Sequence, residues 1–176
     1  MKKSVLLLFF AGCVATGIFG IGRKIPMNRV NDLGQREGYW RDSLGEGITH
    51  ELYYKGGKKD GLFKCFSRND LFVLGEYTAD NMSGTWYMFG DEGELRCTID
   101  SIELNKDSIY TGYCQIFCKY KCYCADYYPS GAVKSEGYMV CDEDFMVDFW
   151  EIGEWKYYDE SGNLIKTKDY GDRRTP

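Results

Sequence analysis

Gly38-Tyr39-Trp40 begins a pattern that returns twice, as Gly61-Leu62-Phe63 and as Gly84-Thr85-Trp86. Each copy is a glycine, a spacer and a large aromatic residue, and successive glycines lie 23 residues apart. Seven residues after each aromatic comes a turn-forming residue, which is Gly47, Asp70 or Gly93. A repeat of this length indicates one supersecondary unit stacked on its neighbours, because a lone unit cannot bury its own apolar face.

Two further copies follow, although the strict spacing lapses before each of them. The fourth copy has Cys124 where the large aromatic stands in the others, and the fifth has Trp155. Extra residues within 98–123 predict an inserted hairpin or a longer loop, and a second insertion covers 139–152. The chain is therefore interpreted as five copies with two interruptions.

Each copy has the sequence character of a β-hairpin. In the fifth, an aromatic run meets the turn-forming stretch 159–163 before the apolar Leu164-Ile165. An isolated hairpin is marginal in water, so the copies are expected to pair edge to edge. The sequence predicts an all-β fold, an elongated antiparallel β-sheet meander of five repeated hairpins. Their centres are expected at Trp40, Phe63, Trp86, Cys124 and Trp155.

Composition supports this interpretation and limits the function. The chain has 176 residues, of which 44% are hydrophobic, and this length suits one domain that can bury a core. Aromatic residues make up 16%, and 21 glycines stand against three prolines, which favours strands and tight turns. The net charge of −5 argues against nucleic-acid binding, because that binding rests on clusters of Lys and Arg.

Residues 1–24 have the character of a targeting or anchoring segment. Met1-Lys2-Lys3 precedes 19 residues without a charge, and Arg23-Lys24 follows them. Phe10-Ala11-Gly12-Cys13 resembles a bacterial lipobox, which would make Cys13 the lipidated first residue. An uncleaved membrane helix and a plain cleaved signal peptide are the alternatives. All three place the rest of the chain in the cell envelope, outside the cytoplasm. The membrane is then a partner through the N-terminus.

The remaining chain divides into three parts. Residues 25–35 are interpreted as a linker, 36–170 as the β-repeat domain and 171–176 as a polar tail. Within the domain, three stretches carry a family resemblance, at 58–63, 127–138 and 155–164. They resemble the variant MORN-repeat proteins of bacteria, including those described as antitoxins of toxin–antitoxin systems. The resemblance implies an extended sheet of hairpins used for binding, and it implies no catalytic residues.

The cysteines invite a metal or disulfide interpretation. The run Cys114, Cys118, Cys122 and Cys124 is a poor match to the paired close spacing of zinc ligands, so no metal site is predicted. All four have even numbers, so in an extended strand they would share one face as small buried hydrophobic residues. Outside the cytoplasm they could instead pair with Cys97 or Cys141 on neighbouring strands.

No constellation of catalytic residues emerges from the sequence. His50 is the single histidine and is interpreted as a surface strand residue, since no nucleophile motif accompanies it. The acidic run Asp142-Glu143-Asp144 could supply the carboxylate pair of a glycoside hydrolase. We expect no cofactor and no enzymatic activity.

The favoured function is a membrane-tethered, non-enzymatic binding or scaffold module for a protein partner. The alternative is a cell-envelope protein that binds or processes carbohydrate, with exposed aromatic rings and an acidic pair. The last copy is the expected partner-facing end, because an open edge can accept a strand from another chain. Large amphipathic rings typical of interface hot spots gather there, at Trp155, Tyr157, Tyr158 and Tyr170.

Overall fold

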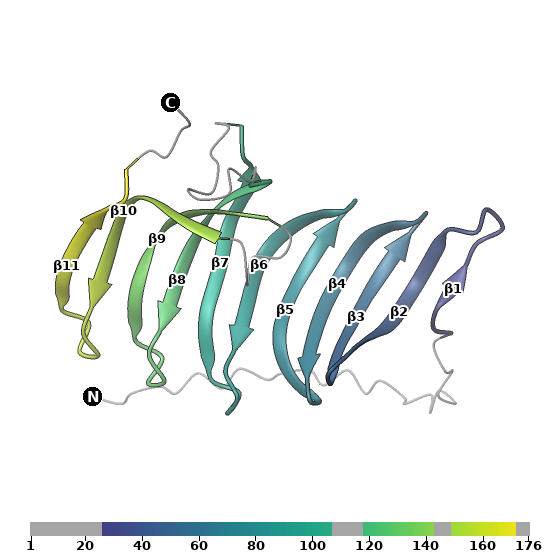
Figure 1. The fold of residues 1–176 in the computed structure, drawn as a ribbon, viewed down its shortest axis with the longest axis horizontal. Coiled ribbons are helices and arrows are strands. Elements are labelled where there is room, and N and C mark those ends of the chain that lie inside the picture. The colour runs from purple at the N-terminus through teal and green to yellow at the C-terminus, as the bar shows by residue number, and fades with distance from the viewer. Residues whose placement is uncertain (1–25, 107–117, 143–148, 172–176) are drawn as a thin grey trace, which may run out of the picture.

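The protein folds as one antiparallel β-sheet in a computed structural model that describes residues 26–106, 118–142 and 149–171. Its eleven strands lie in sequence order, and each pairs with the next (Figure 1). The strands are β1 (Arg29–Val30), β2 (Arg36–Gly45), β3 (Ile48–Lys55), β4 (Lys58–Ser67), β5 (Asp70–Thr78), β6 (Asn81–Phe89), β7 (Leu95–Leu104), β8 (Tyr120–Tyr127), β9 (Val133–Cys141), β10 (Phe149–Tyr158) and β11 (Leu164–Asp169).

The predicted meander of five hairpins is confirmed. The hairpins are β2–β3, β4–β5, β6–β7, β8–β9 and β10–β11, and each contains one of the predicted centres. In the second hairpin the turn lies at Arg68 and Asn69, both with positive φ, and Asp70 begins the following strand. The turn is therefore one residue earlier than the sequence predicts, because Asn69 tolerates the left-handed conformation readily.

The range 25–35, interpreted above as a linker, contributes a strand. Arg29 and Val30 form β1, which pairs with β2. The Asn28 side chain extends this pairing, since it accepts from the Arg41 amide (2.8 Å) and donates to the Arg41 carbonyl (3.1 Å). Residues 1–24, with Cys13, lie outside the described residues. Within the described ranges there is no helix that is long and apolar enough to cross a membrane.

The glycine that precedes each aromatic bends its strand. Gly84 and Gly153 have φ of 64° and 60°, and the pairing register shifts beside each of them. Positive φ at a bulge is readily available to glycine, which has no Cβ. The rings then lie over different glycines: a Cβ on Gly75 would collide with Trp86, and one on Gly137 would collide with Trp155.

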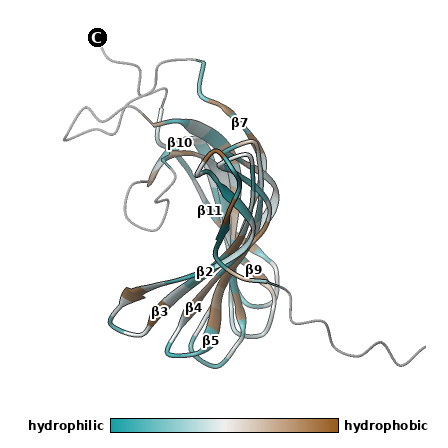
Figure 2. Cartoon of the chain, turned by 90° about the vertical axis from the view of Figure 1, so that its right-hand side faces the viewer, coloured by the Kyte–Doolittle hydropathy of each residue, from teal (hydrophilic) through white to brown (hydrophobic). Residues whose placement is uncertain are grey.

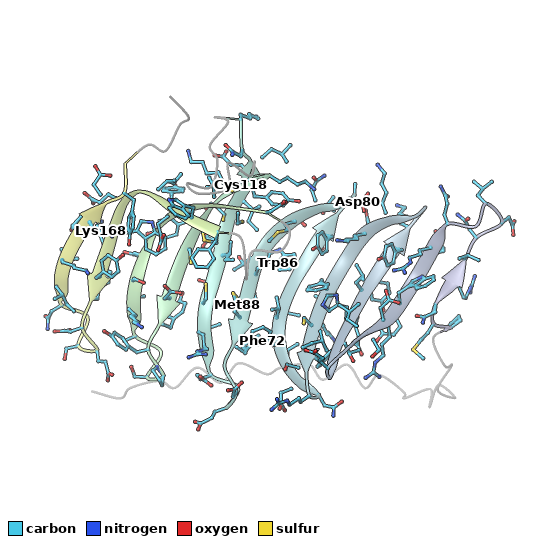
Figure 3. The ribbon with its side chains drawn as sticks, in the orientation of Figure 1. Phe72, Asp80, Trp86, Met88, Cys118 and Lys168 are labelled. Atoms are coloured by element: carbon cyan, nitrogen blue, oxygen red, sulfur yellow. The ribbon has the colours of Figure 1, made fainter. Side chains whose placement is uncertain are left out.

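One face of the sheet is apolar, and we call it the core face. Trp86 and Met88, labelled in Figure 3, lie on the core face. Side chains alternate across a strand, so Tyr87 between them points to the opposite, outer face. Figure 2 shows that the strands are bent rather than flat. The buried residues of this face are Leu52, Phe63, Cys65, Val73, Tyr77, Met82, Trp86, Cys97, Ile99, Tyr120, Cys122, Cys124, Met139, Cys141 and Trp155.

The paired ends of β9 and β10 turn across the sheet instead of continuing its plane (Figure 1). Phe149 at the start of β10 thereby lines one cavity together with Met88 of β6. Tyr120 adds a second link, because its buried hydroxyl accepts a hydrogen bond from the Met82 amide (3.1 Å). The middle of the core face is therefore covered by the chain itself.

The prediction that the even-numbered cysteines share a face is only partly correct. Cys122 and Cys124 in β8 are buried on the core face with Tyr120. Cys118, labelled in Figure 3, precedes β8. It packs in a separate cluster with Val140 and Ile152. The alternation rule fails there because Cys118 does not belong to the strand, and Cys114 lies outside the described residues.

Candidate binding surface on the core face

Two blocks of the sheet share one plan on the core face. In the first, which we call the ring block, Leu52, Phe63 and Gly75 lie opposite one another on β3, β4 and β5. Trp86 of β6 covers Gly75. In the second, the thiol block, Ile99, Cys124 and Gly137 are aligned in the same way on β7, β8 and β9, and Trp155 of β10 covers Gly137.

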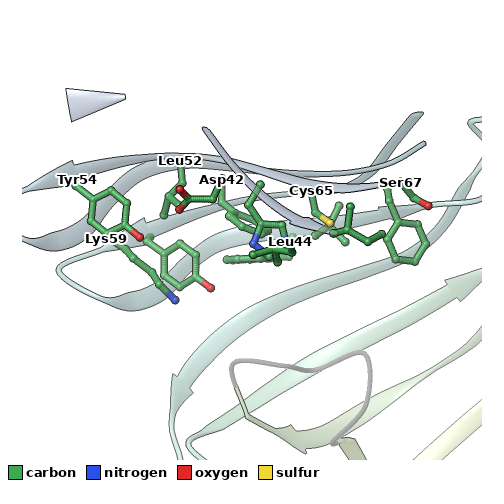
Figure 4. Close-up of a pocket in the computed structure, with 14 residues that line it drawn as sticks. Asp42, Leu44, Leu52, Tyr54, Lys59, Cys65 and Ser67 are labelled. Atoms are coloured by element: carbon green, nitrogen blue, oxygen red, sulfur yellow. The ribbon is translucent and has the colours of Figure 1, made fainter. Parts of the chain in front are cut away.

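The ring block borders a hollow of about 500 Å³, which we call the N-terminal hollow. Aromatic rings form its floor: Phe63 lies 5.4 Å from Trp86 between ring centroids. Tyr54 and Lys59 lie at one end of the hollow and Ser67 at the other (Figure 4). Its lining is mostly apolar, with charged groups confined to a few positions. The lining residues are Asp42, Leu44, Ile48, His50, Leu52, Tyr54, Lys59, Phe63, Cys65, Ser67, Phe72, Val73, Tyr77 and Trp86.

His50 belongs to this hollow, whereas the sequence indicates a surface strand residue. The side chain is half-buried and its ring stands edge-on to Phe63, with 5.1 Å between centroids. Asp42 at the same hollow is held by Arg36, whose guanidinium lies 2.8 Å from the carboxylate. The polar groups at the hollow are thus positioned by the two N-terminal hairpins.

The thiol block borders a second hollow of about 390 Å³, the C-terminal hollow. Cys97 and Cys124 line it, with 3.3 Å between their sulfurs. Asp126 lines it too, and its carboxylate accepts a hydrogen bond from Ser135 (2.8 Å). A second thiol pair, Cys122 and Cys141, lies nearby with 3.7 Å between sulfurs. The possible partners Cys97 and Cys141 noted from the sequence are thus beside the strand β8 cysteines.

Three of the buried thiols, those of Cys65, Cys122 and Cys124, have a pKa raised above the ordinary thiol value. A hydrogen bond with Cys97, followed by burial, raises the pKa of Cys124. The pKa of Cys122 is raised in the same way by Cys141 and by burial. Burial alone raises the pKa of Cys65 in the ring block. A thiol with a raised pKa is a poor nucleophile, because the thiolate is the reactive species.

The four rings predicted for partner binding do not share one surface. Trp155 is 4% exposed and donates its indole hydrogen to the Tyr138 carbonyl (2.7 Å), so it belongs to the core. Tyr157 and Tyr170 pack against the core face and share a hydrogen bond between their hydroxyls (2.7 Å). Tyr158 follows Tyr157 in the strand and therefore points to the outer face, where it donates to Glu136 (2.6 Å).

The last strand, β11, is an edge of the sheet with exposed side chains and two lysines packed over tyrosine rings. All its side chains are exposed, among them Leu164 and Ile165. Lys166 lies 4.4 Å from the Tyr157 ring centroid and Lys168 lies 3.9 Å from that of Tyr170. Lysines on an edge strand disfavour the addition of another strand. Binding by residues 153–170 stays a prediction.

Other expected features fall on residues that the structure does not describe. Of the acidic run Asp142-Glu143-Asp144, only Asp142 is described. The two hollows were not found from the sequence, because the residues that line each come from several strands. The signal that could have indicated the thiol block is Cys124 at a position where the other copies have a ring.

No family model, curated protein or solved structure matches this chain. The resemblance to MORN repeats therefore stays a prediction, while the sheet of repeated hairpins is shown.

Proposed function

We propose that this protein is a membrane-tethered, non-enzymatic binding module of MORN-like repeats that takes up an apolar segment of a protein partner. The observation that carries the proposal is the N-terminal hollow. It combines about 500 Å³ of space with a floor of large rings, on the part of the core face that β2 to β6 form. Apolar pockets with a few fixed polar groups are typical binding sites.

The exposure of Leu44 supports this choice of surface. Leu44 lines the N-terminal hollow yet remains 62% exposed, so part of its apolar surface is available to a partner. Asp42 and Lys59 at the same hollow give charges of both signs. The partner segment that fits is an extended stretch with one or two large apolar side chains flanked by polar residues.

The test begins with a pull-down from solubilised membranes with the full chain, followed by calorimetry with the partner that is identified. Leu44→Glu should weaken binding by about 2 kcal/mol or more, because it puts a charge where an apolar side chain docks. The matched control is Leu62→Glu, on the outer face and 45% exposed. Equal binding by wild type and Leu44→Glu would exclude the hollow.

The C-terminal edge is tested with the same partner. Deletion after Gly171 should preserve binding if the tail has no part in it. The double variant Tyr157→Ala with Tyr170→Ala should weaken binding only if the edge is the docking surface. Binding that survives this double substitution and fails in Leu44→Glu assigns the partner to the hollow.

Membrane tethering through residues 1–24 is part of the proposal and has its own test. Fractionation of the native full-length chain should find it with membranes. Loss of processing and of lipid labelling in Cys13→Ser would support a lipoprotein. Unchanged size and tethering in that variant would support a helix anchor, and a fully soluble cytoplasmic protein would contradict both.

Carbohydrate binding in the cell envelope is a second candidate, favoured by the outer face. Tyr123 and Tyr138 meet there edge-on, with 5.2 Å between ring centroids. The Glu136 carboxylate accepts a hydrogen bond from Tyr158 and interacts with Tyr123. Rings next to carboxylates suit sugar rings and their hydroxyls. Calorimetry with cell-wall oligosaccharides tests this, and Tyr138→Ala should abolish any signal that depends on the outer face.

A further inference from the structure

The C-terminal hollow brings together three side chains that can bind a metal ion. The sulfurs of Cys97 and Cys124 and a carboxylate oxygen of Asp126 all lie within 4.8 Å of one another. Both cysteines are buried, and Asp126 is half-buried. Cys97 comes from β7 and the other two from β8, two residues apart on the core face.

We propose that the C-terminal hollow binds a thiophilic divalent cation, with Zn²⁺ the best fit, through Cys97, Cys124 and Asp126. Thiolate and carboxylate are both ordinary zinc ligands, and thiolates select zinc over magnesium or calcium. Three protein ligands leave one tetrahedral position for a further ligand. All three side chains line the hollow of about 390 Å³. This proposal is independent of partner binding at the N-terminal hollow.

The sulfur geometry fits two thiolates on one cation. Two sulfurs bound to a tetrahedral zinc at ~2.3 Å are ~3.8 Å apart. The Cys97 and Cys124 sulfurs are 3.3 Å apart, so binding requires them to separate by a few tenths of an ångström. Each thiol releases its proton to solvent when the cation binds.

The strand register favours a cation over a disulfide at this pair. Cys97 is aligned with Asp126, and Cys124 with Ile99, so the two cysteines are diagonal neighbours. Diagonal Cα atoms in antiparallel sheets are typically ~7–8 Å apart, and a disulfide bridges more than ~7 Å only with backbone movement. A cation between the sulfurs spans that distance with the strands in place.

Ser135 provides an independent sign of a built site. It is a buried polar residue of β9, and its hydroxyl donates to Oδ2 of Asp126 at 2.8 Å. Such a bond fixes the carboxylate orientation and leaves the other oxygen for a cation, as outer partners do at known metal sites. In the ring block, Cys65 and Val73 occupy the positions that correspond to Asp126 and Ser135. The polar pair of Asp126 and Ser135 is therefore found in the thiol block and not in the ring block.

The ring block also shows why the thiol block has room for a cation. Phe63 occupies the position that corresponds to Cys124, and its ring lies against Trp86. A cysteine there removes the ring and leaves space beside Trp155, which lines the C-terminal hollow. The space and the sulfur thus come from one residue difference between the copies.

The second thiol pair serves as an internal comparison. Cys122 and Cys141 lie 3.7 Å apart, close to the zinc spacing. Among the described residues, however, they are not part of a group of three closely placed ligands. Cys65 of the ring block is buried on the same face but far along the sheet, so it is the matched control for a cysteine change.

The test is titration of the full chain, reduced and in detergent, with Co²⁺ and then Zn²⁺. We expect one equivalent of Co²⁺ to give thiolate-to-cobalt charge-transfer absorption, which Zn²⁺ then displaces. Cys97→Ser and Cys124→Ser should each lose most of this absorption, while Cys65→Ser keeps it. Ser135→Ala should keep the absorption and weaken affinity by about 10–100-fold. Far-ultraviolet circular dichroism shows whether each variant is folded.

Several outcomes would overturn the proposal. These are the lack of charge-transfer absorption in the folded wild type, its persistence in folded Cys97→Ala with Cys124→Ala, or its loss in Cys114→Ser or in Cys122→Ser. A Cys97–Cys124 disulfide found by mass spectrometry in protein isolated without reductant would also overturn it. Unchanged Co²⁺ affinity in Asp126→Asn would remove the carboxylate from the ligand set.

Discussion

The ring block and the thiol block have the same arrangement of paired strands but different side chains on the core face. Phe63 and Cys124 occupy corresponding positions, each opposite a glycine that a tryptophan covers. In the first block the ring contacts Trp86, and in the second the thiol lies beside another thiol and a carboxylate. The repeat fixes the path of the backbone, while the side chains at a few corresponding positions decide whether the core face holds rings or polar ligands.

The largest expected effect on stability is that of Trp86→Ala in the ring block. Trp86 is fully buried and meets both Phe63 and Tyr77, at 5.4 and 5.1 Å between centroids. Its removal should lower the free energy of unfolding by about 3–5 kcal/mol. Urea unfolding followed by tryptophan fluorescence and circular dichroism measures this.

Trp155→Ala is the corresponding change in the thiol block. Its ring has a more distant neighbour, Tyr170 at 6.4 Å, so the loss should fall below that of Trp86→Ala. A loss below about 1 kcal/mol for Trp86→Ala would assign that ring to the surface and end the comparison.

Substitution of the glycines beneath the two tryptophans is expected to cause the next largest loss of stability. Gly75→Ala should lower the free energy of unfolding by about 1–3 kcal/mol, because the added methyl collides with the Trp86 ring. Gly137→Ala should act in the same way on Trp155. In a double-mutant cycle the cost of Gly75→Ala should shrink once Trp86 is alanine. Strictly additive costs would show that the ring does not rest on the glycine.

Tyr120 joins the two blocks, and its hydroxyl offers a smaller test. Tyr120→Phe leaves the buried Met82 amide without that acceptor, so the free energy of unfolding should fall by about 1 kcal/mol or slightly more. Tyr87→Phe is the control, since Tyr87 is exposed on the outer face. Equal unfolding curves for the two variants would mean that the link contributes nothing.

The smallest expected effect concerns tyrosines of the outer face at high pH. Burial, followed by Glu136, raises the pKa of Tyr123 to about 12 from its ordinary 10.0, and burial, followed by Glu51, raises that of Tyr39 to about 12. The stability that rests on each neutral hydroxyl is complete below pH 10. It is lost as the pH rises from 10 toward 12, because the folded state binds the proton more tightly.

Ultraviolet titration of tyrosinate checks this pH dependence at both tyrosines. Tyr123→Phe and Tyr39→Phe should each remove one late-titrating group and flatten the loss of stability above pH 10. Wild-type tyrosines that all titrate together near pH 10 would contradict the prediction.

The sequence predicted the hairpins and their order, and the physical reason is local. Trp40, Trp86 and Trp155 recur with glycines whose positive φ bends the strand, and turn-forming residues follow at fixed spacing. These signals act within one copy, so they can be recognised without knowing where neighbouring copies lie. Alternation also placed Cys122 and Cys124 on one face correctly.

The sequence could not predict which rings are available to a partner. Trp155, Tyr157 and Tyr158 look alike as amphipathic residues near an edge, yet one is buried, one bonds Tyr170 and one bonds Glu136 on the other face. Burial depends on what the next strand and the crossing ends of β9 and β10 place above each ring. His50 was misjudged for the same reason, since Phe63 from the next strand covers it.

The sequence alone determined a repeated antiparallel meander and its five centres, because the residues that set the turns, bulges and alternation lie within each copy. Only the tertiary structure decided which side chains from different strands meet on the core face. Cys97 and Asp126 are 29 positions apart in the chain but directly opposite in register, and Ser135 donates a hydrogen bond to Asp126 from a third strand. Such a site depends on pairing across strands and on the bend of the sheet, which linear spacing does not encode.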